Sequence, residues 1–100
     1  ITGGGVRNLL RLNPEVRFRI TDPPEPQRVF RLIQEWGNVE TSEMYQTFNM
    51  GMGMVLVVPE SECDGVLQAI ERVRPGWKVG SVARGTGVEL PGLKLRYTRY

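Results

Sequence analysis

The sequence lacks histidine altogether and contains one cysteine, Cys63, among its 100 residues. Without histidine, the chain cannot supply an imidazole base, an imidazole metal ligand or a Ser-His-Asp triad. A single cysteine excludes an internal disulfide and a cysteine-based zinc site. We therefore predict no metal site within these residues, and we expect Cys63 to be a partly buried small side chain.

Long hydrophobic runs are also missing. The longest run, Met54–Val58, is far shorter than the roughly 20 apolar residues of a membrane span. No charged segment followed by an apolar one opens the chain, as a signal peptide would. Nor is there a dense basic stripe with interleaved aromatic residues, of the kind that nucleic-acid-binding proteins carry. We expect a cytoplasmic protein with no membrane partner and no nucleic-acid partner.

Charge is unevenly distributed, although the net charge is only +2. Residues 1–31 carry a balance of +3, residues 32–72 a balance of −6 and residues 73–100 a balance of +5. Eleven of the thirteen basic residues are arginine, whose planar guanidinium can bind carboxylate or phosphate through two hydrogen bonds. The pattern fits an anion-binding role and a compositional preference for arginine equally well.

Apolar spacing predicts a single α/β (α+β) domain over residues 1–100, in which helices pack on a mixed sheet. Val16–Ile20 alternates apolar and charged residues, as a strand with one solvent-facing side does. The unbroken apolar run Met54–Val58 is typical of a central strand buried on both faces. Apolar residues at helical spacing predict helices over 6–12, 26–36, 41–48 and 61–73, and further strands are expected over 77–83, 88–90 and 93–97, the last two at an edge.

The glycine string Thr2-Gly3-Gly4-Gly5 is the first candidate site. Glycine adopts backbone conformations closed to other residues and lets a ligand come close. The predicted helix that follows offers free N–H groups and the positive end of its dipole to a phosphate. Arg7 and Arg11 lie four residues apart, so both guanidinium groups can share one side of this helix. A linker or a cloning remnant would also explain the three glycines.

The second candidate site is the segment Phe48–Met54, which leads into the predicted central strand. Gly51 and Gly53 at the entry of a strand favour close approach by a ligand or by another backbone. The side-chain amide of Asn49 can hold a substrate or cap a turn. A tight connection between helix and strand, with methionine filling the core, explains the same residues more simply.

Taken in order, these residues resemble the C-terminal domain of phosphoribosylformylglycinamidine cyclo-ligases, also called aminoimidazole ribonucleotide synthetases. The resemblance covers about residues 1–90, and its glycine string is shared with a wider ATP-dependent superfamily. Many family members have proline where this chain has Leu10, so we expect the first helix to run further here. The residues that carry the resemblance are Ile1-Thr2-Gly3-Gly4-Gly5, Asn8, Arg11, Phe30, Gly37-Asn38-Val39 and, most specifically, Glu43-Met44-Tyr45-Gln46-Thr47-Phe48-Asn49-Met50-Gly51-Met52-Gly53-Met54-Val55.

The resemblance implies that residues 1–100 are the C-terminal piece of a two-domain, homodimeric enzyme whose N-terminal ATP-binding domain is absent. A start at Ile1 rather than at methionine fits that expectation. Family members convert formylglycinamidine ribonucleotide to aminoimidazole ribonucleotide in purine biosynthesis, with ATP and Mg bound mainly by the N-terminal domain. The expected partners are therefore that domain, a second copy of the whole enzyme and the small ribonucleotide substrate.

For the site, the resemblance implies that Thr2, Gly3, Gly4 and Gly5, with Arg11, hold a phosphate of the substrate or of the nucleotide. It also implies that Asn49 and Gly51 line the cleft from the second segment. Catalytic residues are not identified, and the hundred residues alone are expected to be inactive. The alternatives are a non-catalytic phosphate-binding or dimerising module of the same fold, and another member of the wider superfamily.

Overall fold

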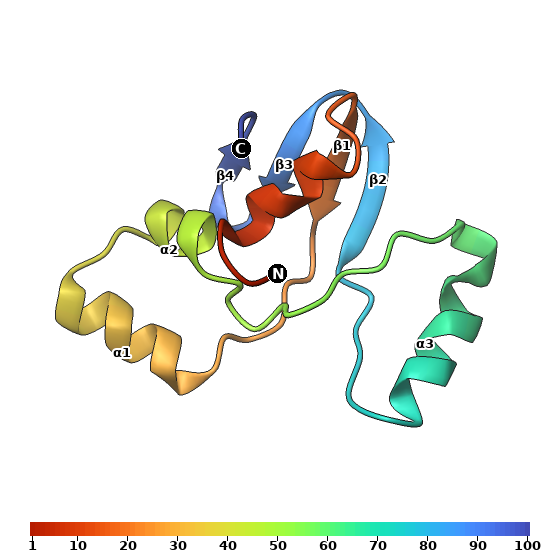
Figure 1. Cartoon of the computed structure of the whole chain (residues 1–100), viewed down its shortest axis with the longest axis horizontal. Helices are drawn as coiled ribbons and strands as arrows, with labels where there is room; N and C mark the ends of the chain where they lie inside the picture. Colours follow the sequence, from red (N-terminus) through yellow and green to blue (C-terminus); the bar gives the residue numbers. More distant parts are fainter.

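A four-stranded mixed sheet forms the centre of the molecule, whose computed structural model describes all residues from 1 to 100 (Figure 1). β1 pairs antiparallel with β2 and parallel with β3, and β4 pairs antiparallel with β3. The predicted mixed sheet of the α+β class is confirmed. The strands are β1 (Val16–Ile20), β2 (Gly80–Arg84), β3 (Gly87–Leu90) and β4 (Leu95–Tyr97), in the order β2-β1-β3-β4.

Helices occupy the four regions where helical spacing predicts them, with ends shifted by at most two residues. The first is a tighter 3-10 helix, and it continues through Leu10 as expected without the proline. None of the helices combines the length and the apolar character that crossing a membrane requires. The helical elements are η1 (Gly5–Arg11), α1 (Arg28–Gly37), α2 (Thr41–Thr47), η2 (Glu60–Glu62), α3 (Cys63–Glu71) and η3 (Pro91–Leu93).

η1 lies over one face of the sheet and α2 packs against η1, and this side contains the hydrophobic core (Figure 1). Alternation along β1 places Phe18 and Ile20 in the core, whereas Arg17 and Arg19 lie on the opposite, uncovered face. We call the sheet, η1, α2 and residues 49–52 the packed unit. The core consists of Val6, Leu9, Leu10, Phe18, Ile20, Met44, Tyr45, Met50, Met52, Val88, Leu90 and Tyr97.

The remaining parts extend away from the sheet, with α1 and α3 on opposite sides of it in Figure 1. Neither helix contains a fully buried residue. The apolar side chains of α1 are half-buried or exposed, and Trp36 is 82% exposed. Trp77, beyond α3, is 59% exposed. We call α1, residues 53–58 and residues 60–79 the outlying segments.

The prediction of a buried central strand at Met54–Val58 is wrong. The segment forms no strand, and Met54 is 82% exposed. A strand needs a neighbouring backbone to complete its ladder of hydrogen bonds. β1 already has a neighbour on each side, and no other strand of the chain pairs with this segment.

Three strand predictions near the C-terminus also change in detail. The strand predicted over 77–83 begins only at Gly80, and the strand predicted over 93–97 begins only at Leu95, because Leu93 ends η3. β3 lies inside the sheet rather than at its edge, because β1 pairs with it in parallel on one side and β4 pairs with it on the other. Local alternation identified these strands, but their order depends on contacts between distant residues.

Candidate functional site

The glycine string lies at the start of η1, where its three glycines have different surroundings. Gly4 and Gly5 have φ angles of 79° and 54°, in a region that side chains disfavour. A Cβ atom at Gly5 would lie 2.0 Å from the carbonyl oxygen of Tyr45, so Gly5 is required for η1 to pack on α2. No atom lies within 4 Å of the corresponding position at Gly3. Only the first part of the string is therefore open to a ligand.

Asn8 holds the string in this conformation. Its Nδ2 donates hydrogen bonds to the carbonyl oxygens of Gly3 and Gly5, the latter at 2.9 Å. Thr2 and Gly3 are exposed, whereas Gly5 is buried. The open part of the candidate site therefore consists of Thr2 and Gly3, and the side-chain amide of Asn8 fixes its backbone. In the sequence, only the family resemblance points to Asn8.

The helix that follows the string attracts an anion less strongly than its predicted dipole suggests. η1 is a 3-10 helix of seven residues, and such helices are short and have poorer hydrogen-bond geometry than α-helices. The attraction of this region for an anion therefore depends on its side-chain charges.

Two arginines of η1 supply those charges. The Cζ atoms of Arg7 and Arg11 lie 5.3 Å and 3.9 Å from the centroid of the Tyr100 ring, so the predicted approach of both guanidinium groups to one place is confirmed. Arg7 Nη2 donates a 3.2 Å hydrogen bond to the carbonyl oxygen of Gln46, and its buried Nε has no partner. The two ion pairs of the chain involve other arginines. Two positive charges therefore remain unneutralised beside Gly4.

Asn49 ties the second candidate segment to the first. Its Nδ2 donates to the carbonyl oxygen of Ile1 at 3.2 Å, and its Oδ1 accepts from the N–H of Gly51 at 2.9 Å. The backbone nitrogen of Ile1 also donates to the carbonyl oxygen of Gly53. The two segments singled out in the sequence thus lie side by side at Ile1, and the Asn49 amide is engaged in holding them together.

The turn at residues 49–52 requires a positive φ angle at Gly51, which glycine adopts readily. Met50 and Gly51 have φ angles of 51° and 97°, and the N–H of Met52 donates a 2.9 Å hydrogen bond to the carbonyl oxygen of Asn49. A Cβ atom at Gly51 would lie 3.2 Å from Oε1 of Gln27, so this glycine faces the segment before α1. Met50 and Met52 belong to the core, as predicted for methionines that fill it. The predicted connection to a strand is wrong, because no strand follows the turn and Met54 is exposed.

Two buried tyrosines lie near the arginine pair. The hydroxyl of Tyr97 donates a 2.6 Å hydrogen bond to the carbonyl oxygen of Ser42. Burial raises the pKa of Tyr45 and of Tyr97 above 10.0; for Tyr97, nearby Arg7 lowers the pKa and Glu43 raises it, both to a lesser extent. Both phenols are neutral near pH 7, so neither neutralises Arg7.

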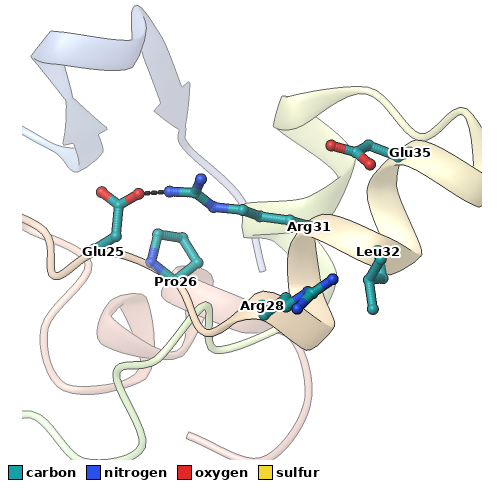
Figure 2. A pocket seen from close by; sticks show the side chains of 6 residues that line it. All are labelled: Glu25, Pro26, Arg28, Arg31, Leu32 and Glu35. Atoms are coloured by element: carbon teal, nitrogen blue, oxygen red, sulfur yellow. Dashed lines mark ion pairs between the residues drawn. The ribbon is translucent and has the colours of Figure 1, made fainter.

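A surface depression of about 510 Å³ lies away from these residues, between the segment before α1 and α1 itself (Figure 2). Arg31 points across it toward Glu25 and forms an ion pair with it. Arg28 and Glu35 also line the depression, so its charges balance. The depression therefore offers no net attraction to an anion such as phosphate.

Comparison with known proteins gives one consistent result. The family model described as AIR synthase related protein, C-terminal domain, matches residues 1–91. The phosphoribosylformylglycinamidine cyclo-ligase of Methanopyrus kandleri is 52% identical over 88 residues, which cover 88% of this chain and 26% of that relative. The proteins of the same name from Thermoplasma acidophilum (39% identity over 100 residues, 100% of this chain and 29% of the relative) and Finegoldia magna (44% over 90 residues, 86% and 26%) are also similar. The chain thus spans between about a quarter and three tenths of the length of these relatives.

Proposed function

This chain belongs to the family of AIR synthase related proteins, as their C-terminal domain, and from that premise we propose that the protein containing it is an ATP-dependent cyclo-ligase. The observation that carries the proposal is the name cyclo-ligase on relatives that match nearly the whole chain. The proposed reaction converts formylglycinamidine ribonucleotide to aminoimidazole ribonucleotide in purine biosynthesis.

In this reaction, ATP supplies the phosphoryl group that makes the formyl oxygen of the substrate a leaving group. The amidine nitrogen attacks the formyl carbon, a C–N bond closes the ring, and the C–O bond breaks. ADP and inorganic phosphate are the other products. Such a reaction requires phosphate groups to be positioned and their charge stabilised, which backbone N–H groups and arginines can do.

Within this domain, we assign the phosphate-binding role to Thr2, Gly3 and Gly4 together with Arg11. The exposed backbone of Thr2 and Gly3 can approach a phosphate closely, and the unneutralised guanidinium of Arg11 can bind it with charge-assisted hydrogen bonds. Arg7 adds a second positive charge from the same helix. Gly5 supports this site through packing. Asn49 adjoins it through the hydrogen bond to the carbonyl oxygen of Ile1, whereas Gly51 faces Gln27 and contributes only through the turn that Asn49 closes.

Mg and ATP are expected to be bound mainly by the part of the protein outside this chain. Residues 1–100 contain no group of three or more histidine, cysteine, aspartate or glutamate side chains that could hold a metal ion. The same outside part is the expected source of the homodimer contacts.

The proposal is tested by assaying the intact protein for ADP release that depends on formylglycinamidine ribonucleotide. Arg11→Gln is expected to lower kcat/KM by about tenfold or more, because charge-assisted hydrogen bonds to phosphate are lost. Arg99→Gln is the matched control: Arg99 is exposed and forms no ion pair, so its activity should equal that of the wild type.

Two results would contradict the assignment. Absence of substrate-dependent ADP release in the presence of Mg would rule out the cyclo-ligase reaction. Binding of phosphate by the intact protein without any turnover would instead favour the non-catalytic module.

A further inference from the structure

We propose that Tyr100 is a displaceable cover of the phosphate site, whose ring occupies the space beside Arg7, Arg11 and Gly4 and leaves it when an anion binds. The inference rests on the proposed phosphate-binding role of the glycine string. It adds Tyr100, which no sequence motif indicates, to the phosphate site. It also implies that the Tyr100 side chain competes with the bound anion.

The ring of Tyr100 lies where a bound phosphate would be expected. Its centroid is 3.9 Å from Cζ of Arg11, within the range of a cation–π contact. Its hydroxyl lies against Gly4, 2.6 Å from the position that a Cβ atom there would take. An anion that reaches both the Gly4 backbone and the Arg11 guanidinium must therefore occupy the space that this side chain fills.

Tyr100 is held there by few interactions. Its side chain is 51% exposed, and both preceding residues, Thr98 and Arg99, are exposed. Its hydroxyl forms no hydrogen bond, whereas the hydroxyl of Tyr97 donates to the carbonyl oxygen of Ser42. The Tyr97 hydroxyl is thus anchored, whereas Tyr100 lies outside the four strands and contributes no hydrogen bond to the sheet.

The exchange favours an anion with several charges. An exposed cation–π contact is a weak interaction, whereas a phosphate accepts charge-assisted hydrogen bonds from arginine, often two at once. Arg7 has a buried Nε without a partner, which Tyr100 does not satisfy. A multiply charged oxyanion therefore displaces the ring, and the ring excludes ligands that bind the arginines more weakly.

The displacement can be observed directly in the intact protein labelled with 3-fluorotyrosine. The Tyr100 resonance is assigned with the Tyr100→Phe variant. Titration with inorganic phosphate should move it toward the position of a solvent-exposed tyrosine, while the buried Tyr97 resonance stays in place. Phosphate binding with an unmoved Tyr100 resonance would overturn this proposal alone. Failure of phosphate to bind both the wild-type and Tyr100→Ala proteins would overturn the phosphate site as well.

A second experiment measures two effects of removing the ring: the accessibility of Arg11 without phosphate, and the affinity for phosphate. Tyr100→Ala should increase the rate at which phenylglyoxal modifies Arg11, followed by mass spectrometry, by about threefold, and should tighten phosphate binding by a similar factor, since a weak competing contact is removed. Tyr100→Phe retains the ring and Arg99→Gln changes only the adjacent charge, so both should behave like the wild type. An unchanged Arg11 rate, or weaker phosphate binding by Tyr100→Ala, would overturn the proposal.

Discussion

The packed unit and the outlying segments contain similar apolar patterns but have different surroundings. In α2, which packs against η1, the side chain of Met44 is fully buried in the core. In α1, the apolar residues follow an equally regular helical spacing, yet none is fully buried. This contrast between α1 and α2 shows that an apolar stripe identifies the side of a helix that favours burial. Whether the same chain contains the surface that buries it is a separate question.

The largest test of this comparison uses two methionines. Met44→Ala should lower the free energy of unfolding of the 100-residue chain by about 2–5 kcal/mol, because it leaves a cavity in the core. Met54→Ala, at an 82% exposed position, should change it by less than about 0.5 kcal/mol. Chemical denaturation measures both values.

Equal effects of the two substitutions would contradict the division into a packed unit and outlying segments. The same two substitutions should also be measured in the intact protein. A cost for Met54→Ala that appears only there would mean that residues outside this chain cover Met54.

The second test compares two glycines of the same string. Gly5→Ala should destabilise the chain by about 2–3 kcal/mol, because its Cβ atom would collide with the backbone of α2 and its φ is positive. Gly3→Ala meets no atom within 4 Å and should cost less than about 0.5 kcal/mol. Thermal unfolding distinguishes them, and a Gly3 effect as large as that of Gly5 would show that the string is packed along its whole length.

The third test removes one hydrogen bond of the packed unit. Tyr97→Phe should cost about 1 kcal/mol, because the carbonyl oxygen of Ser42 loses its donor. Tyr100→Phe, which removes a hydroxyl without a hydrogen bond, is the control and should leave the unfolding midpoint unchanged. A loss of stability in the control would mean that the tail belongs to the packed unit.

The buried phenol of Tyr97 should also make the free energy of unfolding depend on pH. Burial raises the pKa of its phenol in the folded state above 10.0, so the folded chain retains this proton more strongly than the unfolded chain does. The resulting stability is fully present below pH 10 and is lost as the pH rises through the folded-state pKa. Denaturation measured at increasing alkaline pH should show this loss in the wild type and a smaller loss in Tyr97→Phe.

The smallest expected effect comes from the uncovered face of the sheet. Arg19 and Glu89 form a 2.6 Å ion pair there, and the Arg19 side chain is 43% exposed. Glu89→Gln should change the free energy of unfolding by less than about 1 kcal/mol, because solvent and salt screen such pairs. Denaturation at low and high salt checks this, and a larger, salt-independent loss would indicate that this face is covered.

The sequence predicts structure correctly where the deciding contacts are local or lie within the chain. Val16–Ile20 alternates strictly, and the core residues that pack with Phe18 and Ile20 belong to the same hundred residues. Met54–Val58 failed because an apolar run indicates a preference for burial and carries no information about a neighbouring strand. The same limit applies to α3, whose apolar residues match the helical period without reaching the core.

For the candidate site, the sequence predicts the approach of Arg7 to Arg11 from their short spacing, and the structure confirms it. The phosphate-binding role of the glycine string stays a prediction. The sequence did not separate Gly5, which packs against Tyr45, from Gly3, which is open, because that difference arises from a contact with α2. Nor could it indicate Tyr100, which reaches Arg11 only after the chain has crossed the whole sheet.

The positions of the two tryptophans determine what an optical experiment on this molecule reports. Trp36 and Trp77 both lie in the outlying segments and are largely exposed, whereas Tyr45 and Tyr97 lie in the core. Tryptophan emission would therefore report the packing of another domain on α1 or on the region after α3. It would change little when the core unfolds. A blue shift of that emission in a longer chain, with tyrosine absorbance unchanged, would provide a label-free signal of domain docking.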